Sequence, residues 1–323
     1  MRLILKILLG LGVLVCLAIV GGVYVLQTSF PDVGDAPQVQ VEATPERIER
    51  GRYLAYHVSM CIDCHSERNW DYFAAPLKVG SEGQGGEVFP EEMGLPGTLV
   101  APNITPAALG DWTDGEVMRA FTCGVNKHGD PLFPLMPYPL YAQMAQEDAY
   151  AIVAYLRTLA PIAHIPPRSQ LNFPMNLIVR TIPQPYQAPQ APDPSDSVRY
   201  GQYLATIAAC GDCHTQNDHG TPLPGMEMAG GFEFPLPTGK LVRSANITPD
   251  METGIGHWNK AYFIAQFKRF DKPEARAIPA KDGVNTVMPW TMYAGMTESD
   301  LGAIYDYLRT IPPVKNGVDK FPE

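Results

Sequence analysis

The chain is 323 residues long, which at roughly 100 to 200 residues per domain predicts two domains. Hydrophobic residues make up 46% and charged residues 18%, so the chain can fill a core and is not an acidic disordered segment. The net charge of -10 has the wrong sign for binding a phosphate backbone, which excludes nucleic acid as a main partner. Proline accounts for 32 residues, about twice the usual share of roughly 5%, so we expect short helices joined by many loops.

Residues 1–29 are interpreted as a membrane anchor. Residues 7–26 carry no charge, and twenty helical residues at about 1.5 Å each can cross a hydrocarbon core of about 30 Å. Arg2 and Lys6 precede the stretch, which places the N-terminus in the cytoplasm and the rest of the chain outside. A cleaved signal peptide is the competing interpretation, but the apolar run exceeds the usual length of about 7 to 15 residues and no A-x-A site follows it. We therefore predict a retained transmembrane helix.

The exported part divides into two domains and their connections. Residues 30–43 are predicted to be a tether, because Thr44 and Pro45 form a typical helix start and open a first domain over residues 44–165. A proline-rich connector over residues 166–197 separates it from a second domain over residues 198–323. Residues 171–182 of this connector are too apolar for a free linker, so we expect them to pack on a domain face or touch the membrane surface.

The two domains repeat each other. Cys61-Ile62-Asp63-Cys64-His65 recurs as Cys210-Gly211-Asp212-Cys213-His214, and Asn103-Ile104-Thr105-Pro106 recurs as Asn246-Ile247-Thr248-Pro249. Trp112 matches Trp258, and Met136-Pro137 matches Met288-Pro289. Residues 144–159 and 296–311 are identical at eight of sixteen positions without a gap. A duplicated domain follows, mainly α, with long Gly- and Pro-rich loops after each histidine.

Each domain contains one C-x-x-C-H motif. Two cysteine pairs in an exported protein also suit disulfides, zinc or a redox dithiol, but the histidine after each pair favours covalent haem. Cysteines at i and i+3 share one helical face and can each bond to a haem vinyl carbon. We therefore predict two covalently bound haem c groups, held by Cys61 and Cys64 and by Cys210 and Cys213. His65 and His214 are the predicted proximal iron ligands.

Met136 and Met288 are the predicted distal ligands. They lie 71 and 74 residues after the two histidines, and each precedes a proline just before the terminal helix of its domain. A thioether completes a six-coordinate iron and raises its potential relative to bis-histidine ligation. A packing role is the alternative, since Met144, Met292 and Met296 lie nearby in the sequence. The matched position in both repeats favours ligation.

Other cysteines and histidines are weaker candidates. Cys123 has no counterpart in the second domain, so a buried inert thiol is favoured over a ligand at the first haem. The remaining histidines do not recur in both halves, and we expect surface or loop positions for them; they are His57, His128, His164, His219 and His257.

With these motifs in view, the chain resembles the multi-haem cytochrome c subunits of membrane-bound alcohol and gluconate dehydrogenases. The resemblance covers nearly all of residues 44–315 and rests on the two C-x-x-C-H motifs, the Asn-Ile-Thr-Pro segments, the tryptophan after each and the late Met-Pro. It implies two tandem cytochrome c-like domains that carry electrons from a catalytic subunit towards quinone or a terminal oxidase. Members of the family commonly have three haem domains and a C-terminal membrane contact, whereas this chain has two motifs and an N-terminal anchor.

The sequence therefore predicts an electron-transfer protein without catalytic residues of its own. We expect it on the periplasmic face of a bacterial inner membrane, where it takes electrons from a dehydrogenase or a quinol-oxidising complex. The expected partners are a dehydrogenase catalytic subunit, a terminal oxidase or a soluble cytochrome, with quinone as a further candidate. The alternative is a dihaem peroxidase, which requires one open haem iron.

Overall fold

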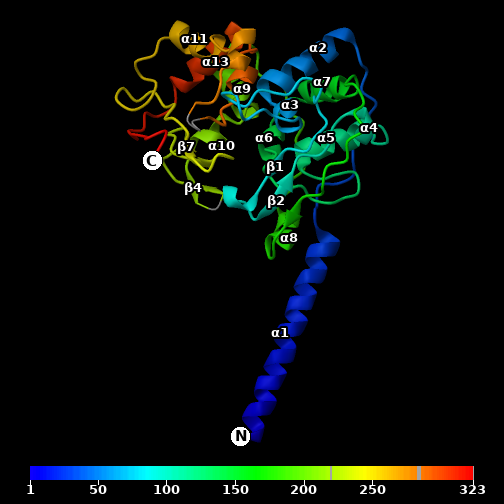
Figure 1. Cartoon of the computed structure of the whole chain (residues 1–323). Coiled ribbons are helices and arrows are strands. Elements are labelled where there is room, and N and C mark those ends of the chain that lie inside the picture. The colour runs from blue at the N-terminus through cyan, green and yellow to red at the C-terminus, as the bar shows by residue number, and fades with distance from the viewer. Residues whose placement is uncertain (219, 282–284, 323) are drawn as a thin grey trace.

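The computed structural model describes residues 1–218, 220–281 and 285–322. Helix α1 (Arg2–Ser29) extends away from the folded body and buries none of its residues (Figure 1). Among the described residues, it is the one helix long and apolar enough to cross a membrane. The predicted apolar N-terminal helix is confirmed.

The first half of the body is mainly helical. Its helices are α2 (Pro45–Tyr53), the π-helix η1 (Leu54–Val58), α3 (Cys61–Cys64), the 3-10 turn η2 (Glu91–Met93), α4 (Pro106–Leu109), α5 (Asp114–Cys123), α6 (Tyr138–Tyr141) and α7 (Gln146–Leu156). Thr44 caps α2 as predicted, because its side chain accepts a hydrogen bond from the Arg47 amide at 3.3 Å. The segment interpreted as a tether packs on this half: the Val41 amide donates to Asp114 at 2.8 Å.

The second half repeats this helical order. After the connector elements α8 (Met175–Ile178) and η3 (Val179–Thr181), its helices are α9 (Ser197–Ile207), α10 (Cys210–His214), α11 (Lys260–Lys268), η4 (Pro273–Ala277), α12 (Trp290–Tyr293) and α13 (Glu298–Leu308). In Figure 1 the two halves lie side by side above α1, with α8 at the lower edge of the body.

Short β-strands form within the long loops and the connector. β1 (Val88–Phe89), β2 (Gly97–Val100) and β3 (Gln170–Leu171) form an antiparallel sheet in that order, in which Val88 faces Val100 and Gly97 faces Leu171. The second half has two hairpins, β4 (Asn217–Asp218) with β5 (Thr221–Pro222) and β6 (Glu233–Pro235) with β7 (Leu241–Arg243). Since β3 belongs to the connector, the sheet attaches the connector to the first half.

The first and last helices of each half cross at a glycine. A β-carbon on Gly51 would lie 1.8 Å from the Ala151 carbonyl oxygen, and one on Gly201 would lie 1.9 Å from the Ala303 oxygen. Such close backbone approach needs a residue without a side chain. α2 and α7, and likewise α9 and α13, are therefore packed directly against each other by a matched glycine.

A π-helix accounts for a one-residue difference between the repeats. Gly51 precedes Cys61 by ten residues, whereas Gly201 precedes Cys210 by nine. The first half contains the π-helical segment η1 at this point, and the second half continues as α-helix to Ile207. A π-bulge accommodates one extra residue in a helix. It thereby brings the first cysteine motif into the same position as the second.

The two halves meet through a reciprocal pair of hydrogen bonds. Tyr53 donates its hydroxyl to Asp300 at 2.5 Å, and Tyr203 at the equivalent position donates to Asp148 at 2.6 Å. Each hydroxyl also accepts an amide, from Thr297 and from Ala145 respectively, at 3.1 Å. One hydrophobic cluster contains residues of both halves. The repeats therefore share a core and are related as the two sides of a pseudo-twofold interface.

This interface predicts unequal effects of two matched substitutions. Tyr53→Phe should reduce the free energy of unfolding by about 1 to 3 kcal/mol, because it leaves the buried Asp300 carboxylate without its tyrosine donor. Tyr203→Phe should cost less, since Asp148 keeps two bonds from the Arg50 guanidinium at 2.8 and 2.9 Å. Urea unfolding of the two variants tests this order, and an equal or larger loss for Tyr203→Phe would contradict it.

Candidate haem sites

Both cysteine motifs occupy the same kind of helical turn. α3 begins at Cys61 and α10 at Cys210, and the residue before each has a left-handed backbone, with φ of 52° at Met60 and 54° at Ala209. A positive φ is uncommon for a residue with a side chain and usually marks a functional constraint. The repeated kink sets the direction of both turns, so each carries its two thiols one helical turn apart.

Each motif histidine is held by a backbone carbonyl. His65 Nδ1 lies 2.7 Å from the Pro102 oxygen, and His214 Nδ1 lies 2.7 Å from the Ala245 oxygen. The carbonyl can only accept, so it fixes the proton on Nδ1 and leaves the Nε2 lone pair free. Burial lowers the pKa of both histidines, which keeps the imidazole in the neutral form that a metal requires.

The Asn-Ile-Thr-Pro segments position these carbonyls. Asn103 follows Pro102, and its side-chain oxygen accepts from the Thr105 amide and hydroxyl, both at 2.8 Å. Its amide group donates to the carbonyls of Ile162 and His164 at 2.8 and 2.9 Å. Asn246 makes the same bonds in the second half, accepting from Thr248 at 2.9 and 2.7 Å and donating to Val314 at 2.8 Å. In each half, the repeated asparagine thus joins two segments. One is the loop whose carbonyl binds the motif histidine, and the other is the chain that follows the terminal helix.

A glycine in each loop completes the support of the histidine. The Gly85 amide donates to the His65 oxygen at 2.8 Å, and the Gly230 amide donates to the His214 oxygen at 2.7 Å. Both glycines have positive φ, and a β-carbon on either would lie within 2.5 Å of the carbonyl carbon of Pro102 or Ala245. This pair was not predicted, although Gly85-Gly86 recurs as Gly230-Gly231 in the sequence.

Two buried tyrosines also recur beside the motifs. Tyr141 donates to the Ser59 oxygen and Tyr293 to the Ala208 oxygen, both at 2.6 Å. Ser59 and Ala208 lie two residues before the first cysteine of each motif. These bonds fasten α6 and α12 to the turn that carries the thiols, and the equal spacing from each Met-Pro pair was a signal in the sequence for them.

Met136 and Met288 occupy equivalent positions. Each is half-buried, contacts the main hydrophobic cluster and lies two residues before a short helix, α6 or α12. The amide two residues later folds back onto the methionine oxygen, at 2.6 Å from Tyr138 and 2.8 Å from Trp290. Met144, Met292 and Met296 are instead buried in the core at 0%, 5% and 1% exposure. Their burial is that of packing residues.

The other histidines and Cys123 were the weaker candidates for iron ligands. The surface or loop position expected for His57 is wrong: it is half-buried on the π-helix, where its Nδ1 contacts the Met292 carbonyl of the other half at 2.7 Å. Three other histidines are exposed, namely His128, His164 and His257, and His219 lies outside the described residues. Cys123 is 5% exposed, and burial raises the pKa of its thiol.

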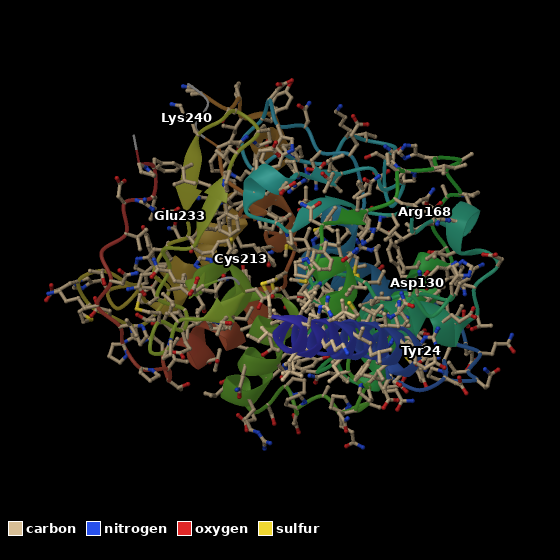
Figure 2. The ribbon with its side chains drawn as sticks, turned by 90° about the horizontal axis from the view of Figure 1, so that it is seen from below. Tyr24, Asp130, Arg168, Cys213, Glu233 and Lys240 are labelled. Atoms are coloured by element: carbon tan, nitrogen blue, oxygen red, sulfur yellow. The ribbon has the colours of Figure 1, made fainter. Side chains whose placement is uncertain are left out.

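The six cysteines, all of them described, form no disulfide with one another. Among the residues that the structure describes, no group of three His, Cys, Asp or Glu side chains is arranged to hold a metal ion. Figure 2, seen from below, shows Cys213 near the middle of the body, inward of Glu233 and Lys240.

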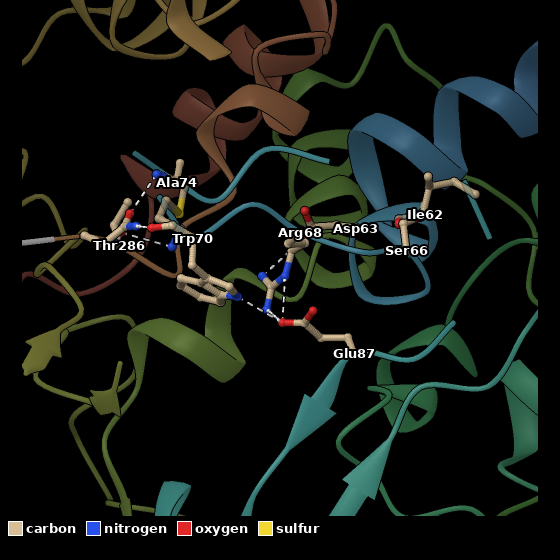
Figure 3. Close-up of polar contacts among 10 residues, drawn as sticks. Ile62, Asp63, Ser66, Arg68, Trp70, Ala74, Glu87 and Thr286 are labelled. Atoms are coloured by element: carbon tan, nitrogen blue, oxygen red, sulfur yellow. Dashed lines mark hydrogen bonds and ion pairs between the residues drawn. The ribbon is translucent and has the colours of Figure 1, made fainter. Parts of the chain in front are cut away.

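A buried charge network distinguishes the first site from the second. Arg68 bonds to Asp63 at 3.3 Å and to Glu87 at 2.8 Å, and its guanidinium lies 4.6 Å from the Trp70 ring centre (Figure 3). Arg68 and Asp63 are 9% and 7% exposed, and burial raises the pKa of the Asp63 carboxyl although Arg68 opposes this. Asp212, the equivalent of Asp63, also has its pKa raised by burial. Asn217 follows His214 at the same spacing as Arg68 follows His65, so the second motif has a neutral residue where the first has a buried arginine.

The network continues into a contact between the halves. Asn285, which is 1% exposed, accepts from the Ala74 amide at 2.8 Å and donates to the carbonyls of Trp70 and Tyr72 at 3.1 and 3.0 Å (Figure 3). The Phe73 amide donates to the Ile278 oxygen at 2.7 Å. The long loop of the first half is therefore held on the second half.

Covalent haem fits both sites on the chemistry of these donors. Each motif presents two thiols on one turn and a neutral imidazole with Nε2 free, and each half also has a half-buried methionine in a repeated turn. The supporting bonds from asparagine, glycine and tyrosine recur in both halves.

Curated proteins with similar sequences include cytochrome c subunits of the kind that the motifs resemble. The chain is 28% identical over 291 residues to the cytochrome c subunit of a quinone alcohol dehydrogenase from Gluconacetobacter polyoxogenes, covering 84% of this chain and 58% of the relative. The chain is therefore similar in sequence to cytochrome c subunits of dehydrogenases. The gluconate 2-dehydrogenase cytochrome c subunit of Pantoea cypripedii is 27% identical over 287 residues, with 84% and 60% coverage. A diheme cytochrome c-type protein of Cereibacter sphaeroides is 29% identical over 206 residues, with 58% and 63% coverage.

No family model matches the chain. The chain spans somewhat more than half the length of the dehydrogenase subunits to which it is similar. The resemblance predicted from the two C-x-x-C-H motifs and the Asn-Ile-Thr-Pro segments is confirmed.

Proposed function

We propose that this chain is a membrane-anchored dihaem cytochrome c that transfers electrons from a dehydrogenase to a respiratory acceptor. Cys61, Cys64, Cys210 and Cys213 bind two haem c groups through thioether bonds. His65 and His214 are the proximal ligands, and Met136 and Met288 are the distal ligands. The haem supplies one-electron transfer when it is bound. The observation that carries the proposal is the matched pair of histidines, each with Nδ1 bonded to a carbonyl 2.7 Å away.

The protein's own residues hold each site in one geometry. The Pro102 and Ala245 carbonyls orient the imidazoles, and Asn103 and Asn246 keep those carbonyls in place. A site that moves little between its two oxidation states transfers electrons with little reorganisation, because its donors and dipoles are already arranged. The shared core of the two halves supports this rigidity.

The partner is inferred from the relatives. Those named above include cytochrome c subunits of an alcohol and a gluconate dehydrogenase, and a fructose dehydrogenase cytochrome subunit of Gluconobacter japonicus is 28% identical over 281 residues. We infer that a dehydrogenase catalytic subunit donates electrons to this chain. A terminal oxidase, a soluble cytochrome or quinone accepts them. Helix α1 keeps the haem domains at the outer face of the inner membrane.

The proposal predicts that the resting protein has no open iron. The reduced, detergent-purified chain should bind no carbon monoxide at stoichiometric level, and its electron paramagnetic resonance spectrum should contain low-spin haem only. Stoichiometric carbon monoxide binding at one haem would contradict the electron-transfer function and favour a peroxidase. Purification from membranes without harsh detergent should recover a dehydrogenase subunit together with the chain.

A further inference from the structure

The connector between the two halves contacts the end of the apolar helix. Arg180 in η3 donates its Nε hydrogen to the carbonyl oxygens of Leu26 and Phe30, at 3.1 and 3.0 Å. α8 and η3 both lie against α1, and Figure 1 shows α8 at the lower edge of the body where α1 begins to extend away. Arg180 therefore links a segment 150 residues away to the last turn of α1.

This contact places the connector at a defined height. The apolar stretch of α1 ends at Leu26, before the polar residues Gln27 to Ser29. Tyr24, which is 66% exposed, is the type of residue that concentrates at a membrane surface. If α1 spans the bilayer, Leu26 lies at the outer edge of the hydrocarbon core. Because Arg180 bonds to the carbonyl of Leu26, α8 lies at the level of the lipid headgroups.

The connector exposes apolar side chains at this level. Phe173 is 79% exposed and Ile178 is 43% exposed, and Met175 and Leu177 between them are half-buried. A short helix with exposed aromatic and aliphatic side chains can bury them between headgroups and acyl chains. Exposure of this kind costs free energy in water, at about 25 cal/mol per Å² of apolar surface.

The charge of the connector fits an anionic lipid surface. Residues 161–192 contain no aspartate or glutamate and carry Arg168 and Arg180, in a chain whose net charge is -10. Basic residues near a membrane surface are attracted to anionic lipids, whereas acidic ones are repelled. The acidic residue Glu91 accepts a hydrogen bond from Asn172 at 3.0 Å, while residues 161–192 themselves add no negative charge.

We propose that residues 170–182 form a second membrane contact, in which Phe173 and Ile178 insert into the outer headgroup layer beside α1. The proposal rests on α1 being the retained anchor of the proposed function. Without the second contact, the orientation of the body over the bilayer would depend only on the packing of residues 30–43 on the first half. The second contact, with Arg180 bonded to the end of α1, holds both haem sites at one height and orientation over the bilayer.

Cysteine alkylation of the full-length haem protein in lipid nanodiscs tests this contact. The nanodiscs contain phosphatidylethanolamine and phosphatidylglycerol, the background is Cys16→Ser, and the reagent is a water-soluble maleimide. Single variants Phe173→Cys and Ile178→Cys report on the connector. Val79→Cys, at a side chain that is 100% exposed, is the aqueous control, and Tyr24→Cys is the membrane control. We expect the connector variants to react roughly tenfold or more slowly than the Val79 variant, the factor that corresponds to burial of a large apolar side chain.

Two outcomes would overturn the proposal, and they are distinguishable. If Tyr24→Cys reacts slowly while Phe173→Cys and Ile178→Cys react as fast as Val79→Cys, the anchor holds and the connector does not touch lipid. If Tyr24→Cys also reacts at the aqueous rate, both the anchor and the second contact are wrong.

A second variant tests the role of the arginine. Adding Arg180→Gln to Phe173→Cys should raise the alkylation rate towards that of the Val79 variant, since it removes the bonds to Leu26 and Phe30. Arg47→Gln, which removes an exposed ion pair with Glu147, should leave the rate unchanged. Equal rates with and without Arg180→Gln would overturn the part of the proposal in which this arginine fixes the connector.

Discussion

Met136→Ala should leave the first haem without its sulfur ligand, and Met288→Ala should do the same at the second. A thioether raises the reduction potential of a c-type site, so each variant should have one site with a lower potential and one unchanged. Each should also lose about half of the near-infrared sulfur-to-iron absorption, since the two methionines occupy matched turns. The reduced variants should bind about one carbon monoxide per chain, because an open iron is then available.

The chain offers matched controls for this experiment. Met144 and Met296 are equivalent methionines buried in the core at 0% and 1% exposure, and replacing either with leucine should change stability but neither potential. A Met136 variant that keeps its six-coordinate spectrum and potential would show that another ligand serves the first haem. Cys123 and His128 would then be the residues to replace there, and Met292 and His219 would be those to replace at the second.

Removing one cysteine pair should halve the haem content of the protein. The double variant Cys61→Ala/Cys64→Ala should retain one covalent haem per chain, as should Cys210→Ala/Cys213→Ala, because α3 and α10 are separate turns with separate histidine supports. Acid-acetone extraction followed by a haem-to-protein ratio measures the covalent haem. The matched controls are Cys16→Ala and Cys123→Ala, which should both keep two haems.

The shared core adds an expectation about folding. If the halves were independent domains, loss of the haem from one half would leave the stability of the other half unchanged. The two halves are joined by one hydrophobic cluster and by the Tyr53–Asp300 and Tyr203–Asp148 bonds. Each double variant should therefore unfold at a lower temperature than the unmodified protein, in both halves. A haem ratio of one in the unmodified protein would contradict the dihaem assignment, and an unshifted transition in the second half would contradict the coupling.

Several features of the fold could be predicted because they depend on residues close together in the chain. The uncharged stretch of residues 7–26 predicted helix α1, since a helix satisfies its own backbone hydrogen bonds. Thr44 predicted the start of α2, where its side chain accepts the Arg47 amide at 3.3 Å. The gapless repeat of residues 144–159 and 296–311 predicted two equivalent helices, and α7 and α13 each contain eleven residues.

The repeat also predicted which residues occupy equivalent positions in the two halves, but not how they are supported. The register of Cys, His, Asn and Met was readable because duplication preserves spacing, apart from the one residue that the π-helix η1 absorbs. The carbonyls of Pro102 and Ala245 gave no signal, because every residue has a carbonyl and only the path of the loop decides which one meets the histidine.

The sequence by itself determined the two C-x-x-C-H motifs, the duplicated helical order, the apolar N-terminal helix and the resemblance to dehydrogenase cytochrome c subunits. Tertiary structure alone decided that the halves share one core, that Tyr53 bonds to Asp300 and that Arg180 bonds to the end of α1. Those contacts join residues 247 and 154 positions apart. Capping and helical periodicity act over a few neighbours, whereas a contact at such separation depends on how every intervening loop closes and packs.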